Sequence, residues 1–229
     1  MATQLTWLGH GTWLIETAGQ RIILDPFLDD NPAAPVKAGE VQADCLLVSH
    51  GHFDHVADAA AIANRTGATV VANYEITDWL QAKQGVRHVV GMNLGGGVQL
   101  TWGHVKMTLA YHSSMLPDGS NGGNPGGFLL TLDGGQRVYF ACDTAVFGDM
   151  QRIGAAVIDL AVLPIGDLFT MGPEDAIEAI QLIRPKRVVP AHYNTWPPIV
   201  QDPHAWAAAV RQLTSAEPVV VAPGGKIEL

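Results

Sequence analysis

The stretch that decides the interpretation of this chain is His50-Gly51-His52-Phe53-Asp54-His55. It places three imidazoles and one carboxylate within six positions, in a sequence that has nine histidines in all. These groups are ligands that suit Zn²⁺, Mn²⁺ or Fe²⁺. In a loop, His50 and His52 can point the same way while Asp54 and His55 reach a second point. The spacing therefore predicts ligands for two metal ions, because a merely polar surface turn has no use for four such groups so close together.

Apolar runs place this stretch at the end of a buried strand. Cys45–Ser49 precedes it, and the alanine-rich Val56–Asn64 follows with the pattern of a helix that ends near Gly67. Before it, three segments are typical of strands: Leu5–Leu8, Thr12–Thr17 and Arg21–Leu24. After it, strands are predicted at Val70–Ala72, Val98–Trp102, Val105–Tyr111, Phe128–Leu132 and Arg137–Cys142. Hairpin turns are expected at Gly103-His104 and Asp133-Gly134-Gly135.

The C-terminal part of the chain alternates between strand and helix patterns. Strands are predicted at Leu160–Leu163, Arg187–Pro190 and Val219–Val221. Helices are predicted at Pro173–Ile183 and Pro203–Leu213, and an earlier one at Glu75–Lys83. The mixture predicts an α/β fold with two sheets packed face to face and helices outside, in one domain that spans residues 1–229.

The acidic composition limits the expected partners. The chain carries 13 Lys and Arg against 22 Asp and Glu, a net charge of −9, which argues against nucleic acid and against docking on anionic membranes. No apolar run approaches the roughly 20 residues of a membrane helix, and no signal-peptide pattern opens the sequence. We therefore expect a cytoplasmic protein with no membrane partner. Cys45 and Cys142 lie in apolar runs, which predicts buried thiols and no disulfide framework.

Three more ligand-type residues, His112, Asp143 and His192, each come directly after an apolar strand-like run. In layered α/β folds, sites assemble at the carboxyl ends of strands. With the first cluster, four strand ends offer five histidines and two aspartates. That is the ligand inventory for two metals held ~3.5–4 Å apart.

These residues resemble the signature of the metallo-β-lactamase superfamily, in the family's order and over nearly the whole chain. Further matching segments are Trp7-Leu8-Gly9-His10-Gly11, Leu24-Asp25-Pro26-Phe27, Gly166 to Pro173, and His192-Tyr193-Asn194-Thr195. They are similar to the small bacterial metal-dependent hydrolases of this superfamily, a branch related to ascorbate-6-phosphate lactonases and N-acyl-phosphatidylethanolamine phospholipases D. The resemblance implies a four-layer αββα sandwich and a hydrolase, without naming the reaction.

The resemblance also implies which residues would hold the metals. It assigns three ligands to one metal, three to a second, and one bridge: His50, His52 and His112; Asp54, His55 and His192; and Asp143. Zn²⁺ is the preferred ion, with Mn²⁺ and Fe²⁺ as alternatives, because His and Asp accept all three. Asp143 stands where true β-lactamases have a cysteine, so antibiotic hydrolysis is not the expected role.

A dinuclear site of this kind predicts hydrolysis by a bridging hydroxide, since two metals lower the pKa of a shared water to about 7. We expect attack on a small ester, lactone, thioester or amide, with Asp54 orienting the hydroxide. His10, Asp167 and a metal-bound water are the candidate proton donors to the leaving group, although His10 is equally typical of a structural histidine. Asp25 is expected to orient a histidine of the cluster.

The loops expected to overhang the site, residues 113–127, 166–172 and 193–198, contain no Lys or Arg. Their apolar side chains are Met115, Leu116, Phe169, Met171, Tyr193 and Trp196. A phosphate-rich substrate would call for a cation there, so a neutral or partly apolar small molecule is favoured. Such a rim is also typical of a subunit interface, which leaves a homo-oligomer open. The loop 113–127 has the length and glycine content of a mobile lid.

The sequence also allows two alternative functions. The first is a phosphodiesterase or nuclease of the same fold, which the net charge disfavours, as does the short interval between Asp143 and His192, where no nucleic-acid-binding domain fits. The second is a non-catalytic metal-binding or redox-sensing protein. The complete ligand set argues against it.

Overall fold

The chain forms two seven-stranded sheets in the computed structural model, which describes residues 3–229. In spatial order, the first sheet contains β14 (Lys226–Glu228), β1 (Gln4–Trp7), β2 (Trp13–Thr17), β3 (Gln20–Leu24), β4 (Cys45–Leu47), β5 (Thr69–Asn73) and β6 (Val89–Met92). The second contains β13 (Glu217–Pro218), β12 (Arg187–Ala191), β11 (Leu160–Pro164), β10 (Arg137–Phe140), β9 (Gly126–Leu132), β8 (Gly103–Leu109) and β7 (Gly97–Leu100).

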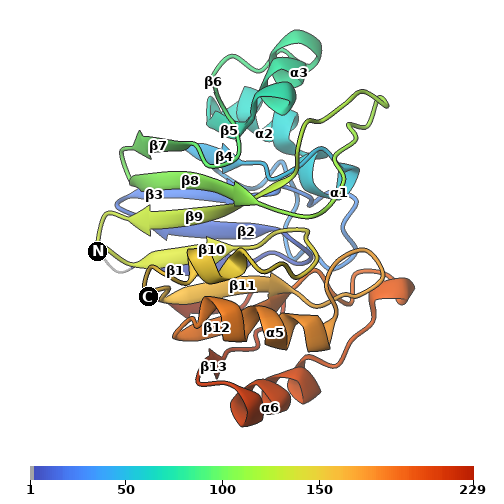
Figure 1. Ribbon diagram of the computed structural model, residues 1–229. Helices are drawn as coiled ribbons and strands as arrows, with labels where there is room; N and C mark the ends of the chain where they lie inside the picture. The colour runs from blue at the N-terminus through green and yellow to red at the C-terminus, as the bar shows by residue number, and fades with distance from the viewer. Residues whose placement is uncertain (1–2) are drawn as a thin grey trace.

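Helices cover the outer faces of both sheets (Figure 1). The first sheet is covered by α2 (Ala59–Thr66) and α3 (Tyr74–Gln84), preceded by the short α1 (Phe53–Val56). The second is covered by α4 (Met150–Ile153), α5 (Pro173–Ile183) and α6 (Pro203–Leu213). The expected α/β fold, a four-layer αββα sandwich, is thereby confirmed.

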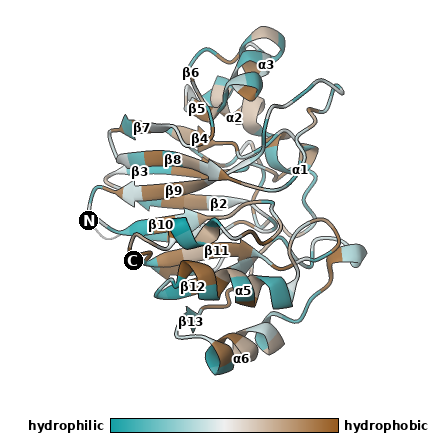
Figure 2. Cartoon of the chain, viewed as in Figure 1, coloured by the Kyte–Doolittle hydropathy of each residue, from teal (hydrophilic) through white to brown (hydrophobic). Residues whose placement is uncertain are grey.

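The core explains this layering. Side chains from both sheets, among them Trp13, Phe128 and Phe140, are fully buried between the sheets. A second cluster, which includes Ile62 and Leu80, lies between the first sheet and its helices. Burying one such side chain contributes roughly 1.5–3 kcal/mol. Accordingly, hydrophobic residues run along the strands, whereas α3, α5 and α6 carry hydrophilic residues on their other faces (Figure 2).

Strand direction brings the chemistry to one edge. Strands β3 to β6 run parallel to one another, as do β10 to β13. The segments that follow β4, β8, β10 and β12 carry the predicted ligands, and they gather with α1 at the edge opposite the two chain ends (Figure 1). Within residues 3–229, no helix has the length and apolar character needed to cross a membrane.

Some predicted elements were wrong in detail. Val219–Val221 is not a strand; the pairing with β12 stops at Pro218, although the Val219 amide still donates to the Val188 carbonyl. The hairpin turn lies at Thr101-Trp102 and not at Gly103-His104, because β7 and β8 pair up to Leu100 and Gly103. Gly103 begins β8, and its lack of a side chain allows close approach to Thr131, since a Cβ there would lie 2.5 Å from the Thr131 carbonyl oxygen. The predicted helix Val56–Asn64 is divided into α1 and α2. The short elements β6, β14 and α4 were not predicted.

Candidate metal centre

The structure brings together all seven predicted ligands. On one side, Nδ1 of His52 lies 3.0 Å from Nε2 of His50 and 3.2 Å from Nε2 of His112. On the other side, Asp54, His55 and His192 form a second group, which also includes His10. Within each group the ligand atoms lie within 4.8 Å of one another. These are two neighbouring sets of donors with the composition expected for two cations.

The carboxylate of Asp143 lies between the two groups. Its Oδ2 is 3.0 Å from Nε2 of His192 and 3.3 Å from Nε2 of His55. The same oxygen is 3.6 Å from Nε2 of His112 and 3.9 Å from Nε2 of His50. Asp143 therefore faces both groups. That ligation itself occurs stays a prediction.

Asp25 orients a histidine in each group. Its Oδ2 accepts a hydrogen bond from Nδ1 of His55 at 2.8 Å and another from the Ser49 hydroxyl at 2.7 Å. Ser49 in turn accepts from Nδ1 of His50 at 3.0 Å. Both imidazoles thus carry their hydrogen on Nδ1, which leaves the Nε2 lone pairs facing the carboxylates. The buried Nε2 of His55 has no hydrogen-bond partner among the described residues, which is the state of a donor atom that a cation would satisfy.

Electrostatics also favour a cation here. Burial would raise the pKa of Asp143, but the imidazoles of His192 and His55 hold it well below its ordinary value. Burial lowers the pKa of His55, yet three carboxylates raise it well above its ordinary value: Asp143, Asp25 and Asp54. Burial keeps the pKa of His50 well below its ordinary value, so that imidazole is neutral. The centre is thus rich in negative charge and neutral donors, and it demands positive charge that bound metals would supply in place of protons.

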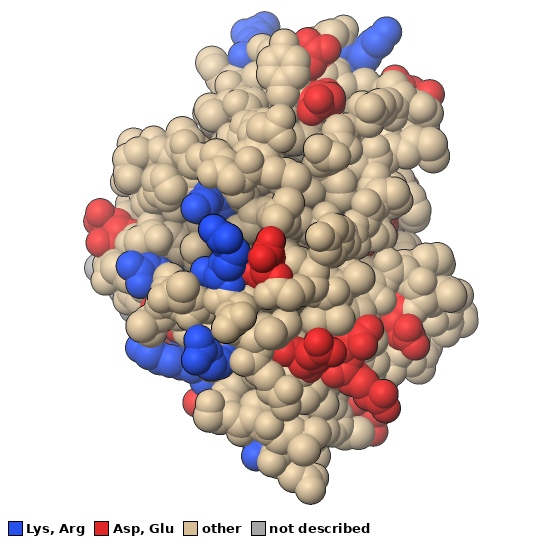
Figure 3. Space-filling view, in the orientation of Figure 1, with Lys and Arg blue, Asp and Glu red and all other residues tan. Residues whose placement is uncertain are grey.

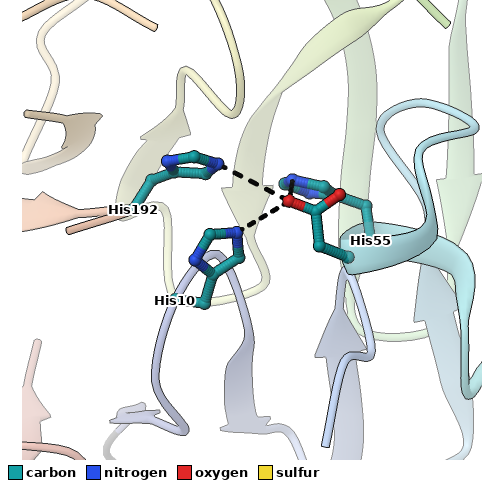
Figure 4. A group of neighbouring side chains, drawn as sticks. His10, His55 and His192 are labelled. Atoms are coloured by element: carbon teal, nitrogen blue, oxygen red, sulfur yellow. Dashed lines mark hydrogen bonds and ion pairs between the residues drawn. The ribbon is translucent and has the colours of Figure 1, made fainter. Parts of the chain in front are cut away.

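His10 forms a hydrogen bond with the carboxylate of Asp54. His10, His55 and His192 point toward one carboxylate oxygen, Oδ2 of Asp54, at 3.0, 3.7 and 3.8 Å (Figure 4). Burial first, and the neighbouring His192 next, lower the pKa of His10 to about 4. The neutral ring therefore donates from Nε2 to Asp54, while Nδ1 accepts from the Thr195 hydroxyl at 2.8 Å. Both ring nitrogens are engaged by the protein.

Asp167 is not brought into the cluster. It is exposed on the turn after β11, with a left-handed φ of 62°. Its carboxylate accepts a hydrogen bond from the Leu168 amide at 2.8 Å, and it does not line the cavity over the metal ligands.

A cavity of about 530 Å³ opens over the metal centre. Its floor is made of ligand-type side chains, and most of its walls are apolar: Phe53, Met115, Leu116, Pro117, Phe169 and Trp196. Met171 and Tyr193, which were also expected on the rim, are buried instead. Phe53 was not predicted, although it stands inside the ligand motif itself and is 55% exposed.

Basic side chains stay away from this cavity. None of the residues that line it is Lys or Arg. On the face shown in Figure 3, the basic residues gather at the left and at the top, away from the loops at the right-hand edge. The cavity wall therefore lacks Lys and Arg, as the sequences of the surrounding loops predicted.

Comparison with known proteins agrees with the fold and the cluster. A family profile described as "Beta-lactamase superfamily domain" matches residues 4–192. Fold, ligand cluster and profile together define a protein of the beta-lactamase superfamily, which confirms the resemblance seen in the sequence.

Close relatives narrow the family. The chain is 47% identical over 231 residues to a UPF0173 metal-dependent hydrolase of Pelotomaculum thermopropionicum, covering 99% of this chain and 100% of the relative. It is 49% identical over 209 residues to one from Thermus thermophilus, covering 91% and 92%. Among solved structures, Igni18, a metallo hydrolase from Ignicoccus hospitalis, superimposes with a TM-score of 0.90 at 34% identity, covering 100% and 99% of the two chains. The chain belongs to the UPF0173 family of metal-dependent hydrolases, and the predicted enzyme class is confirmed.

Proposed function

We propose that this chain is a dinuclear hydrolase of small, uncharged carbonyl substrates: esters, lactones, thioesters or amides. The observation that carries the proposal is the position of Asp143, whose Oδ2 faces a histidine group on each side. His50, His52 and His112 would hold one ion, and Asp54, His55 and His192 the other. Zn²⁺ is the preferred ion. When bound, such a pair supplies hydroxide at neutral pH and a Lewis acid that stabilises the charge developing on the carbonyl oxygen.

The chain's own residues orient the predicted metal ligands. Asp25 sets the tautomers of His50 and His55. His10 fixes the rotation of the Asp54 carboxylate, so we assign it a positioning role rather than that of proton donor. The exposed turn position of Asp167 gives it no comparable contact.

The cavity walls support the substrate class. They are apolar and carry no basic side chain to pair with a phosphate, which ranks a phosphodiesterase second. The open cavity gives a substrate access to the metal ligands, which disfavours a purely metal-binding or sensing role. A location in the cytoplasm, an absence of nucleic-acid partners and assembly into homo-oligomers stay predictions from the sequence.

Metal analysis followed by an activity screen tests the proposal. We expect about two metal equivalents per chain after reconstitution, with activity on p-nitrophenyl acetate and lactones above that on bis-p-nitrophenyl phosphate. Asp143→Ala is expected to lose about half of the metal and at least about 100-fold in kcat/KM, because both groups lose a shared ligand. Asp78→Asn, an exposed carboxylate on α3, is the control and should leave both unchanged. About one equivalent of metal or less in the reconstituted protein would refute the dinuclear site, and a reversed substrate ranking would favour the phosphodiesterase.

A further inference from the structure

One cavity side chain is polar without belonging to the predicted ligand set. The hydroxyl of Ser113 lies on the cavity wall, directly after His112 in the chain. Its Oγ is 3.3 Å from Nε2 of His52. Apart from Trp196, whose indole carries an N–H, the other cavity residues are either predicted ligands or apolar, so Ser113 has the one hydroxyl group among the residues that line this cavity.

The geometry of His52 determines the direction of that hydrogen bond. Nδ1 of His52 faces Nε2 of both His50 and His112, so Nδ1 is the atom that would bind the ion. A neutral imidazole that presents its Nδ1 lone pair carries its hydrogen on Nε2. His52 therefore donates to Ser113, and the Ser113 hydroxyl accepts.

The hydrogen of the Ser113 hydroxyl is left free to donate. Its Oγ has no other hydrogen-bond partner among the described residues, and the side chain is exposed to the cavity. Ser49 differs in this respect. Its hydroxyl also accepts a hydrogen bond from a ligand histidine, His50, but it donates its own hydrogen to the buried carboxylate of Asp25. Of the two serines that support ligand histidines, only Ser113 presents a donor to the cavity.

We propose that Ser113 donates a hydrogen bond to the substrate oxygen that gains negative charge during hydrolysis, with His52 holding the serine in its donor orientation. This inference rests on the proposed function. For an ester, the oxygen of a water adds to the carbonyl carbon, and the bond from that carbon to the leaving oxygen then breaks. The bonding electron pair goes to the leaving oxygen. One proton from the water ends on that oxygen and the other goes to solvent, so that a carboxylate and an alcohol are released and Ser113 is unchanged.

The surroundings favour a catalytic effect of measurable size. A fixed donor aimed at developing charge in a water-poor site contributes up to about 10²–10³-fold in rate. Because Ser113 lies on an exposed part of the wall, we expect the lower end of that range or less, about 10–100-fold. The same donor serves the carbonyl oxygen or the leaving oxygen, and a series of leaving groups distinguishes these two positions.

The experiment compares Ser113→Ala, Ser113→Thr and Ser49→Ala with the wild type in protein whose full metal occupancy is verified. Each variant is assayed on aryl and alkyl acetates of increasing leaving-group pKa, and its metal affinity is measured by competition with a chelator. Ser113→Ala should lose about 10–100-fold in kcat/KM at full occupancy, and Ser113→Thr, which keeps the hydroxyl, should recover most of it. A loss that grows with leaving-group pKa locates the bond at the leaving oxygen; a uniform loss locates it at the carbonyl oxygen.

Ser49→Ala separates donation to substrate from support of a ligand. It should weaken metal binding, by about 10–100-fold, with no dependence on the leaving group once metal is saturating. If Ser113→Ala weakens metal binding but keeps the wild-type kcat/KM on all acetates at full metal occupancy, Ser113 is only a support for His52 and the inference is wrong. An inactive wild type with full metal occupancy would instead refute the proposed function itself.

Discussion

Several residues of the candidate site adopt a left-handed backbone conformation. His10, Asp25 and His192 have φ of 55°, 46° and 53°, although none of them is glycine. Such positions cost about 1–3 kcal/mol each and persist where surrounding contacts determine them. Here those contacts are the hydrogen bonds between His10 and Asp54 and between Asp25 and His55. At this edge of the sheets, the hydrogen bonds of the side chains therefore compensate for the conformational cost of the left-handed backbone.

For single residues, the chemical types of the site side chains were predictable from the sequence, but their hydrogen-bond partners were not. The ligand types in His50–His55 and the expected role of Asp25 followed from the sequence. That His10 binds Asp54, and that Ser49 connects His50 to Asp25, depends on contacts across long stretches of chain, which residue spacing does not encode.

Cys45 carries a prediction about pH. Burial, with a smaller contribution from Asp44, raises the pKa of its thiol to about 12. Because the folded-state pKa lies above the unfolded value of 9.0, its contribution to stability is complete below pH 9 and is lost as the pH rises toward 12. Between pH 9 and 10.5 the unfolding free energy of the wild type should fall more steeply than that of Cys45→Ala, by up to about 1.4 kcal/mol per pH unit. Urea titrations at several pH values measure this, and parallel curves for the two proteins would contradict it.

At the scale of elements, the loop 113–127 is fastened to α3. The side-chain amide of Asn73 donates to the carbonyls of Gly122 and Asn124 at 2.6 and 2.9 Å, and its Oδ1 caps α3 by accepting from the Ile76 amide. The indole of Trp79 donates to Asp118 at 2.8 Å. This loop supplies Met115, Leu116 and Pro117 to the cavity wall. Its opening as a lid stays a prediction, and Asn73 is the residue that would control it.

Substitution of Asn73 separates the helix cap from the loop anchor. Asn73→Ala should lower the unfolding free energy by about 2 kcal/mol, since a helix cap and two hydrogen bonds to the loop, one of them buried, are lost together. Asn73→Ser keeps a capping oxygen but is too short to reach the loop, so it should cost less. Hydrogen exchange of residues 113–124 should rise equally in both variants, whereas exchange in α3 should rise mainly in Asn73→Ala. Unchanged exchange in the loop would show that other contacts hold it.

The boundaries of helices and strands were predictable where the sequence carries clear start or stop signals. The bounds of α5 and α6 matched the prediction, because each begins with a proline at its first helical position and buries one apolar face. The strand at Val219–Val221 was wrong, since an apolar β-branched run also suits an edge segment without a pairing partner. The short β6 and β14 are held by their neighbours, so their own sequences carry little signal.

At the scale of the whole molecule, the candidate metal centre joins the two sheets. His50 and His55 follow β4 of the first sheet, whereas His112, Asp143 and His192 follow strands of the second. An ion held by ligands from both sheets therefore binds the folded protein and not the unfolded chain. Metal binding and global stability should be linked.

Removal of metal tests this linkage. A chelator should lower the melting temperature by about 10 °C, because metal at about 1,000 times its dissociation constant stabilises the fold by about 4 kcal/mol, and each kcal/mol shifts a domain of this size by about 2–4 °C. Calorimetry before chelation, after it and after metal is returned measures the shift, and recovery on metal addition is the control. Identical melting curves with and without metal would contradict a centre shared by both sheets.

The ligand types, the α/β class and the absence of Lys and Arg from the loops around the site could be predicted from the sequence, because these depend on composition and local periodicity. The two ligand groups and the place of Asp143 between them were implied by the family resemblance, and the structure shows the side chains in those positions. The contacts of His10, the position of Asp167 outside the cluster and the free hydroxyl that Ser113 presents to the cavity became visible only in the folded chain. The physical reason is that ligand geometry depends on how strand ends from two sheets meet in space. That meeting is set by the packing of the buried core rather than by any segment alone.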